Sequence, residues 1–209
     1  MTIKRHDGPS DGRLVVGSAL AKRFGRHAKL SPLGGAAQTG SPLPFYHLGL
    51  DDAARSSPLQ FAKRTGWRFP VVGGDTPGLV IVSEQQTNSK FEGLSYGVVA
   101  QRLIQASNIA DQELGSHKEQ YEPRLLDVPA LHFVALWLAG PNDVFIPLLD
   151  GNPPGTAPLS IVGDFEARIQ AELAKRAKSA PPGGTKSSPT NYSGVGNSGD
   201  RNSSDTNFK

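Results

Sequence analysis

Large apolar side chains are most concentrated between residues 121 and 149, which read YEPRLLDVPALHFVALWLAGPNDVFIPLL. Nearly every position of Ala130–Leu138 is apolar, and a proline and a glycine bound this run. A short run of this kind, rich in β-formers, is typical of a strand rather than a helix. In a strand, Phe133 and Trp137 would share one face and Leu136 would lie on the other. Because both faces are apolar, we expect a central strand covered on both sides.

Four further segments have the length and composition of strands and lie on both sides of this run: Tyr121–Val128, Val144–Leu149, Trp67–Val72 and Leu79–Gln85. The first two, with the central run, predict an antiparallel meander, and the last two predict a hairpin around a Gly- and Pro-rich turn. Pro147 and Pro70 lie inside two of these strands. Proline has no N–H to donate to a sheet, so Pro70 is predicted to mark an edge strand. The strand with Pro147 is predicted either to lie at an edge or to stop pairing at the proline.

Apolar residues recur at helical spacing in two places. One stripe predicts a helix over residues 97–114, with Ser95 as its cap and Gly115 as its stop: Val99, Leu103, Ala106, Ala110 and Leu114. A second helix is predicted over Phe165–Lys178, capped by Asp164. Residues 31–58 and the stretch around Thr87–Lys90 are interpreted as loops. Near the N-terminus, Leu14–Phe24 has the pattern of a weak basic amphipathic helix.

These elements predict one α+β domain at residues 58–178. Its sheet is expected to be mostly antiparallel, with about five strands in the order β-β-α-β-β-β and one or two covering helices. Residues 1–57 are interpreted as a loosely structured basic arm and loop. Residues 179–209 contain almost nothing that could be buried and are predicted to be a disordered tail.

Composition narrows the possible functions. The chain has no cysteine, which excludes disulfides and thiol nucleophiles, and a cytoplasmic location is expected. The N-terminal apolar run is short for a secretory signal, although a cleaved signal remains an alternative, and no stretch is long enough to span a membrane. The net charge of +3 is unevenly distributed. Seven Lys and Arg against two Asp occupy residues 1–30, and six against two occupy residues 175–209, so the body between them is acidic.

No motif in the sequence specifies a reaction. The five histidines have no metal-binding spacing, and the glycine-rich turn at residues 73–78 is followed by a strand, so neither a metal nor a phosphate cofactor is predicted. His132 lies within the predicted central strand, and either Asp127 or Asp143 is the candidate carboxylate to approach it. This set defines the enzyme hypothesis, and a satisfied core or interface histidine is the alternative.

The favoured hypothesis is therefore a non-enzymatic protein-binding domain that docks a partner at a sheet edge. Its candidate binding residues lie on the two proline-marked strands: Trp67, Phe69, Val144 and Ile146. Two alternatives remain. One is an enzyme that uses His132 with Asp127 or Asp143, and the other is electrostatic attachment to nucleic acid or an anionic membrane through the basic termini.

Overall fold

The computed structural model describes residues 2–24, 37–73, 76–84, 88–114, 118–150, 159, 161 and 165–179. The described part contains nine strands: β1 (Thr2–Ile3), β2 (Gln38–Thr39), β3 (Leu43–His47), β4 (Lys63–Val72), β5 (Gly78–Glu84), β6 (Ser89–Tyr96), β7 (Gln120–Val128), β8 (Phe133–Ala139) and β9 (Val144–Asp150). It also contains four α-helices: α1 (Gly12–Phe24), α2 (Leu50–Ala53), α3 (Val98–Leu114) and α4 (Phe165–Ser179). The predicted mixture of helices and strands is correct, but the expected number of strands was too low.

All nine strands belong to one sheet with the main order β6-β5-β4-β3-β7-β8-β9. Neighbours pair antiparallel except β3 and β7, which run parallel. The short strands β1 and β2 pair with β7 and β4, respectively. The predicted hairpin (β4 and β5) and the predicted meander (β7, β8 and β9) are both confirmed.

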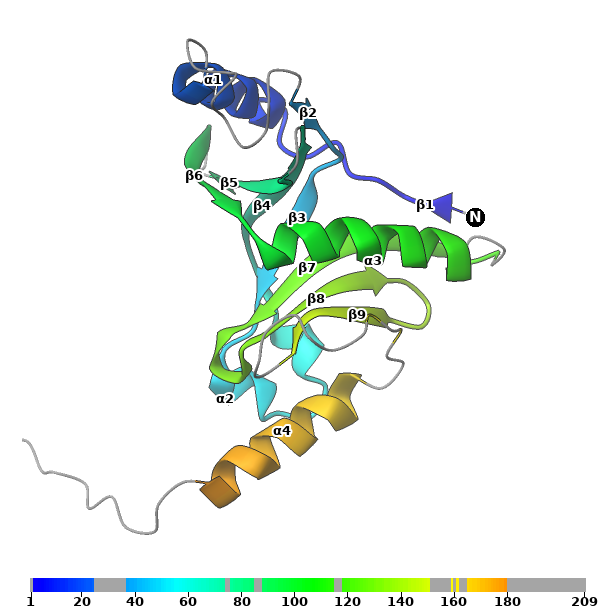
Figure 1. Ribbon diagram of the computed structural model, residues 1–209. Helices are drawn as coiled ribbons and strands as arrows, with labels where there is room; N and C mark the ends of the chain where they lie inside the picture. The colour runs from blue at the N-terminus through cyan, green and yellow to red at the C-terminus, as the bar shows by residue number, and fades with distance from the viewer. Residues whose placement is uncertain are drawn as a thin grey trace, which may run out of the picture. The chain divides into compact units, whose positions relative to one another are not determined.

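The sheet bends around α3, so this helix contacts strands at both ends of the sheet (Figure 1). The core on the inner face joins Leu103 of α3 to Leu79 of β5 and Ile146 of β9. The outer face has two separate cores. One lies under α1 and includes Val16, and the other lies under α2 and α4 and includes Phe165.

The central apolar run forms β8, with two corrections at its start. From Phe133 onward the predicted alternation is confirmed: Phe133 and Trp137 lie in the outer core, and Leu136 lies in the inner core. Before it, Pro129–Leu131 forms a 3-10 helix, and His132 has a left-handed backbone with a φ of 50°. His132 is therefore exposed at a turn and is not a member of the strand.

The prediction that Pro70 marks an edge strand is wrong, because β4 lies between β3 and β5. Pro70 is opposite Leu79 of β5, and on its other side β3 pairs only as far as Arg68 while β2 begins at Val71. The missing N–H therefore falls in a gap between two partner strands. The Pro70 carbonyl still accepts a hydrogen bond of 2.7 Å from the Gly40 backbone N–H. The edge prediction from Pro147 is confirmed, because β9 ends the strand order.

Two segments interpreted as loops contain helices or strands. Within residues 31–58 the described part contains β2, β3 and α2, and β3 lies in the middle of the sheet. The polar stretch before residue 91 includes the start of β6, which also contains Ser95, the residue expected to cap the helix. Two helices occur where they were predicted, as α3 and α4. The basic stretch Leu14–Phe24, interpreted as part of a loosely structured arm with a weak helical pattern, lies in α1. The proposed cap Asp164, the stop Gly115 and the tail from residue 180 lie outside the described residues.

Candidate functional site

Three of the four predicted binding residues have buried side chains. Trp67 and Phe69 have 4% and 0% of their surface exposed, because they face the core beneath α1. Ile146 is equally enclosed beneath α3, and only Val144 is partly exposed. A partner at β9 could therefore use the backbone edge of that strand and little of its side chains.

The structure does not bring the predicted catalytic residues together. His132 lies at the turn before β8, and no hydrogen bond or ion pair within the described residues joins it to either candidate carboxylate. Asp143 accepts a hydrogen bond of 3.3 Å from the Gly140 backbone N–H in the turn between β8 and β9. Asp127 instead faces His47, at 4.0 Å from its Nδ1.

The Asp127–His47 pair is part of a partly buried charged cluster that the sequence did not indicate. Burial raises the pKa of Asp127, and the nearby charges of His47 and Arg68 oppose that rise. Burial also lowers the pKa of Arg68 to about 10. The Arg68 guanidinium lies 3.6 Å from the ring centroid of Phe45. These residues lie on β3, β4 and β7, far apart in sequence, so no local pattern could have shown that they meet.

Among the described residues, the main strand order ends at β6 and β9, and these two edge strands differ in what surrounds them. Both faces of β9 are covered. Ile146 packs beneath α3, while the Phe145 ring stacks on Phe165 of α4 with 4.4 Å between centroids. Within the described part of the chain, β6 pairs only with β5 and lies beside α1. Its side chains alternate between partly buried and exposed.

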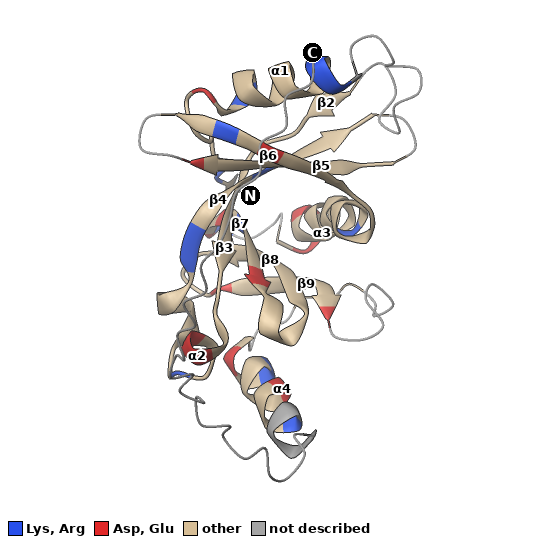
Figure 2. Ribbon diagram, turned by 90° about the vertical axis from the view of Figure 1, so that its left-hand side faces the viewer, with Lys and Arg blue, Asp and Glu red and all other residues tan. Residues whose placement is uncertain are grey.

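A groove of about 770 Å³ lies between α1 and β6. Val15 and Ala19 of α1 and Phe91 of β6 form its apolar wall, while Lys22 and Arg23 lie at the C-terminal end of the helix. Figure 2 shows α1 above β6, with basic residues at the end of the helix. The groove also includes Leu14, whose side chain is 74% exposed.

Hydrogen bonds hold α1 against β6. Asp11, which precedes the helix, accepts two hydrogen bonds from Ser89 at the start of β6: one of 2.8 Å from the backbone N–H and one of 2.5 Å from the hydroxyl. These bonds hold the pKa of Asp11 below its usual value. A Cβ at Gly12 would lie 2.9 Å from Phe69 and 2.7 Å from Pro9, so the close approach of this turn to the sheet requires glycine.

Among the described residues, no three His, Asp or Glu side chains gather closely enough to hold a metal ion. None of the helices in that part of the chain has the length and apolar content needed to cross a membrane.

The fold and these surfaces define an α+β protein with one strongly bent mixed sheet and a basic, partly apolar groove beside an edge strand. No family model matches the chain, and no curated protein or solved structure is significantly similar to it.

Proposed function

We propose that this protein is an interaction domain that binds an extended, acidic segment of another protein along β6, beside α1. The observation that carries the proposal is the coincidence of a one-sided edge strand with a groove that has an apolar wall and a basic end. An edge strand offers backbone N–H and C=O groups to an added strand, and a neighbouring groove discriminates between the side chains of that strand.

The chemistry of the partner follows from the groove. Every second side chain of an added strand points to the same face. Apolar side chains of the partner would contact Val15, Ala19 and Phe91, and an acidic side chain near one end would meet Lys22 and Arg23. β6 has eight residues, so the contact would be small and of the transient class. The basic end would contribute to the rate and selectivity of binding more than to its affinity.

The proposal is tested by selecting binders from a displayed library of random octapeptides on the full chain. We expect the selected peptides to combine alternating apolar residues with Asp or Glu. Their binding should be lost with the double variant Lys22→Glu and Arg23→Glu and retained with Arg13→Glu, which changes an exposed charge on the same helix outside the groove. Amide hydrogen exchange should slow along β6 when such a peptide is bound.

Three outcomes would contradict this function: no enrichment of acidic peptides, equal loss of binding with Arg13→Glu, or slowed exchange at β9 instead of β6. The third outcome would move the docking site to the other edge, as the sequence also allowed. Binding to anionic vesicles or duplex DNA that depends on Lys22 and Arg23 and weakens steeply with salt would favour electrostatic attachment instead.

A second candidate function is acid–base chemistry at Asp127. It rests on one observation, a partly buried carboxyl group with a raised pKa beside the imidazole of His47. Raised carboxyl pKa values of this kind occur at catalytic sites, although structural clusters also produce them. This candidate requires that a substrate bound at this cluster be turned over, and that Asp127→Asn abolish turnover without weakening substrate binding.

A further inference from the structure

A second hollow lies inside the bend of the sheet, away from the groove at α1. It is a cavity of about 280 Å³ between α3, the N-terminal segment and the ends of β4, β7 and β8. Several of the residues that line it are buried leucines, among them Leu103, Leu136 and Leu138. The volume lies just below the usual range for sites that take drug-sized ligands, which is about 300–1,000 Å³. The cavity therefore suits a small, largely apolar molecule.

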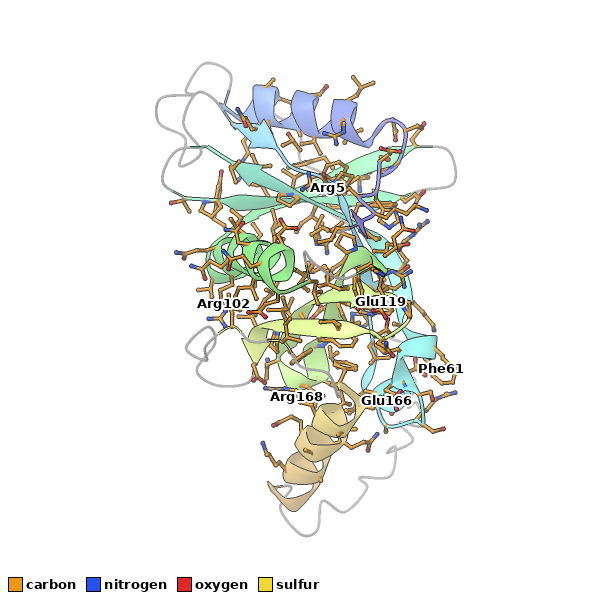
Figure 3. All side chains as sticks on the ribbon, turned by 90° about the vertical axis from the view of Figure 1, so that its right-hand side faces the viewer. Arg5, Phe61, Arg102, Glu119, Glu166 and Arg168 are labelled. Carbon is orange, nitrogen blue, oxygen red and sulfur yellow. The ribbon has the colours of Figure 1, made fainter. Side chains whose placement is uncertain are left out.

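The N-terminal segment forms one wall of this cavity. β1 pairs with β7 at Tyr121, before the part of β7 that pairs with β3. The Lys4 backbone N–H donates a hydrogen bond of 2.8 Å to the Tyr121 carbonyl. Ile3 and Arg5 line the cavity. Figure 3 labels Arg5 above α3, beside the strands that lie beneath α1.

The side chain of His6 anchors this segment from the opposite face. His6 Nε2 lies 2.8 Å from Glu122 Oε1, which also accepts a hydrogen bond of 2.8 Å from Arg124 Nε. The His6 ring meets Trp67 edge-on, with 5.5 Å between ring centroids. His6 therefore holds the N-terminal segment in position, and the adjacent residue Arg5 lines the cavity.

The rim of the cavity carries polar groups that are not used within the fold. Arg5, Asn108 and Asp111 line it, and all three side chains are exposed. Within the described part of the chain, none of them makes a hydrogen bond or ion pair, and Arg5 and Asp111 do not pair with each other. By contrast, the Ser107 hydroxyl at the same rim donates a 2.9 Å hydrogen bond to the Leu103 carbonyl. The rim thus presents one cation, one anion and one amide to a ligand in the cavity.

We propose that this cavity binds a free α-amino acid with a large apolar side chain. The ligand carboxylate would pair with Arg5, its ammonium group would pair with Asp111, and its side chain would occupy the apolar floor. A ligand with only one charge would leave the opposite rim charge without a partner, whereas a zwitterion satisfies both. Arginine is well suited to a carboxylate because its planar guanidinium donates two parallel hydrogen bonds.

The direct test is calorimetric titration of the full chain with L-leucine and L-phenylalanine. Two analogues of leucine separate the charges: isocaproate lacks the ammonium group, and isoamylamine lacks the carboxylate. We expect the amino acids to bind and both analogues to bind at least about tenfold more weakly. A hydrogen bond to a charged group contributes about 1.5–3 kcal/mol, so Arg5→Gln and Asp111→Asn should each weaken binding by about tenfold to about a hundredfold.

Matched variants show whether a loss of leucine binding comes from the cavity itself or from a change in surface charge or stability. Lys4→Gln and Glu113→Gln change exposed charges on the same two segments without touching the cavity, and both should bind leucine normally. Ser107→Leu places a larger side chain in the cavity and should abolish binding without lowering the thermal midpoint of unfolding. In the wild type, leucine should shift the methyl signals of Leu136 and Leu138.

Absence of binding and of methyl shifts with every standard amino acid would overturn the proposal. Equal binding of isocaproate and leucine, with no effect of Asp111→Asn, would also overturn it, because the site would then take a simple carboxylate. Neither result bears on the peptide groove at α1, because none of these variants changes a residue that lines that groove.

Discussion

Replacing Ile146 with alanine tests how β9 is oriented in the sheet. The Ile146 side chain has 0% of its surface exposed and lies in the core between α3 and the sheet. Its partner in β8 is Leu136, which faces the same core. Val144 lies two residues earlier, on the same face of the strand, but is only partly buried. It is therefore the matched control.

The expected loss in the free energy of unfolding follows from this difference in burial. Removing the buried part of an isoleucine and leaving a cavity costs about 2–5 kcal/mol in the free energy of unfolding. A partly exposed valine leaves a smaller cavity, so Val144→Ala should cost about 1 kcal/mol, near the typical effect of a single substitution. Domains are commonly stable by only about 5–15 kcal/mol, so Ile146→Ala should remove a sizeable part of the total.

Urea unfolding followed by tryptophan fluorescence measures both variants, because Trp67 and Trp137 are buried in different cores. The midpoint should fall much further for Ile146→Ala, with an unchanged slope. If both variants cost the same, Ile146 is not enclosed and the inner face of β9 is assigned wrongly. The same reasoning means that a lysine at position 146 would destabilise the fold itself, so docking at β9 is better tested with Val144→Lys alone.

Three further predictions concern single contacts. Gly66 has a φ of 154°, and a Cβ there would lie 2.5 Å from the Val82 carbonyl oxygen. Gly66→Ala should therefore lower the free energy of unfolding in urea by about 1–3 kcal/mol. Gly17→Ala is the control and should not destabilise the protein, because a Cβ at Gly17 meets nothing within 4 Å. Asp11 has a lowered pKa because Ser89 donates hydrogen bonds to it, so its contribution is present above the ordinary Asp pKa and is lost as pH falls through the lowered value. The Tm difference between wild type and Asp11→Asn should accordingly be present at neutral pH and disappear in acid, and a difference that persists in acid would contradict this reasoning. Burial raises the pKa of Asp127, while the charge of His47 opposes the rise. A carboxyl ¹³C titration of His47→Ala should therefore show a further rise in the pKa of Asp127. An unchanged or lower pKa would show that the pair does not interact.

Elements that bury a large apolar surface were predictable from local pattern. The helix at residues 98–114 has its apolar stripe at helical spacing, and β8 is a continuous apolar run. β6 was missed because only Phe91, Leu94 and Tyr96 among its eight residues are large and apolar, which is too few to indicate a buried strand. β3 was missed because Pro42 precedes it, Pro44 lies within it and it has only five residues. Its position in the sheet comes from pairing with β4 and β7, which is not a local property.

The candidate sites were less predictable than the fold. Pro70 indicated an edge in isolation, and only the gap between β2 and β3 explains how a central strand accommodates it. His132 was placed in a strand because apolar residues surround it, but Pro129 begins a 3-10 turn that ends with His132 in a left-handed conformation. The residues that line the cavity come from distant segments, so that site could not be predicted from spacing along the chain. The groove is mostly one face of α1, and only its position beside Phe91 of β6 is not a local property.

The N-terminal segment connects the two proposed sites, and this determines how their tests should be compared. Arg5 lines the cavity beneath α3, and Asp11, six positions later, clamps α1 to β6 through Ser89. His6 is fixed between them by contacts with Glu122 and Trp67. If His6 holds the segment rigidly, Arg5→Gln should affect only amino-acid binding and Asp11→Asn only peptide binding. If leucine changes the affinity of a selected peptide in the wild type, then by linkage the peptide must change the affinity for leucine by the same factor. If the N-terminal segment carries this coupling, His6→Ala should reduce both effects together.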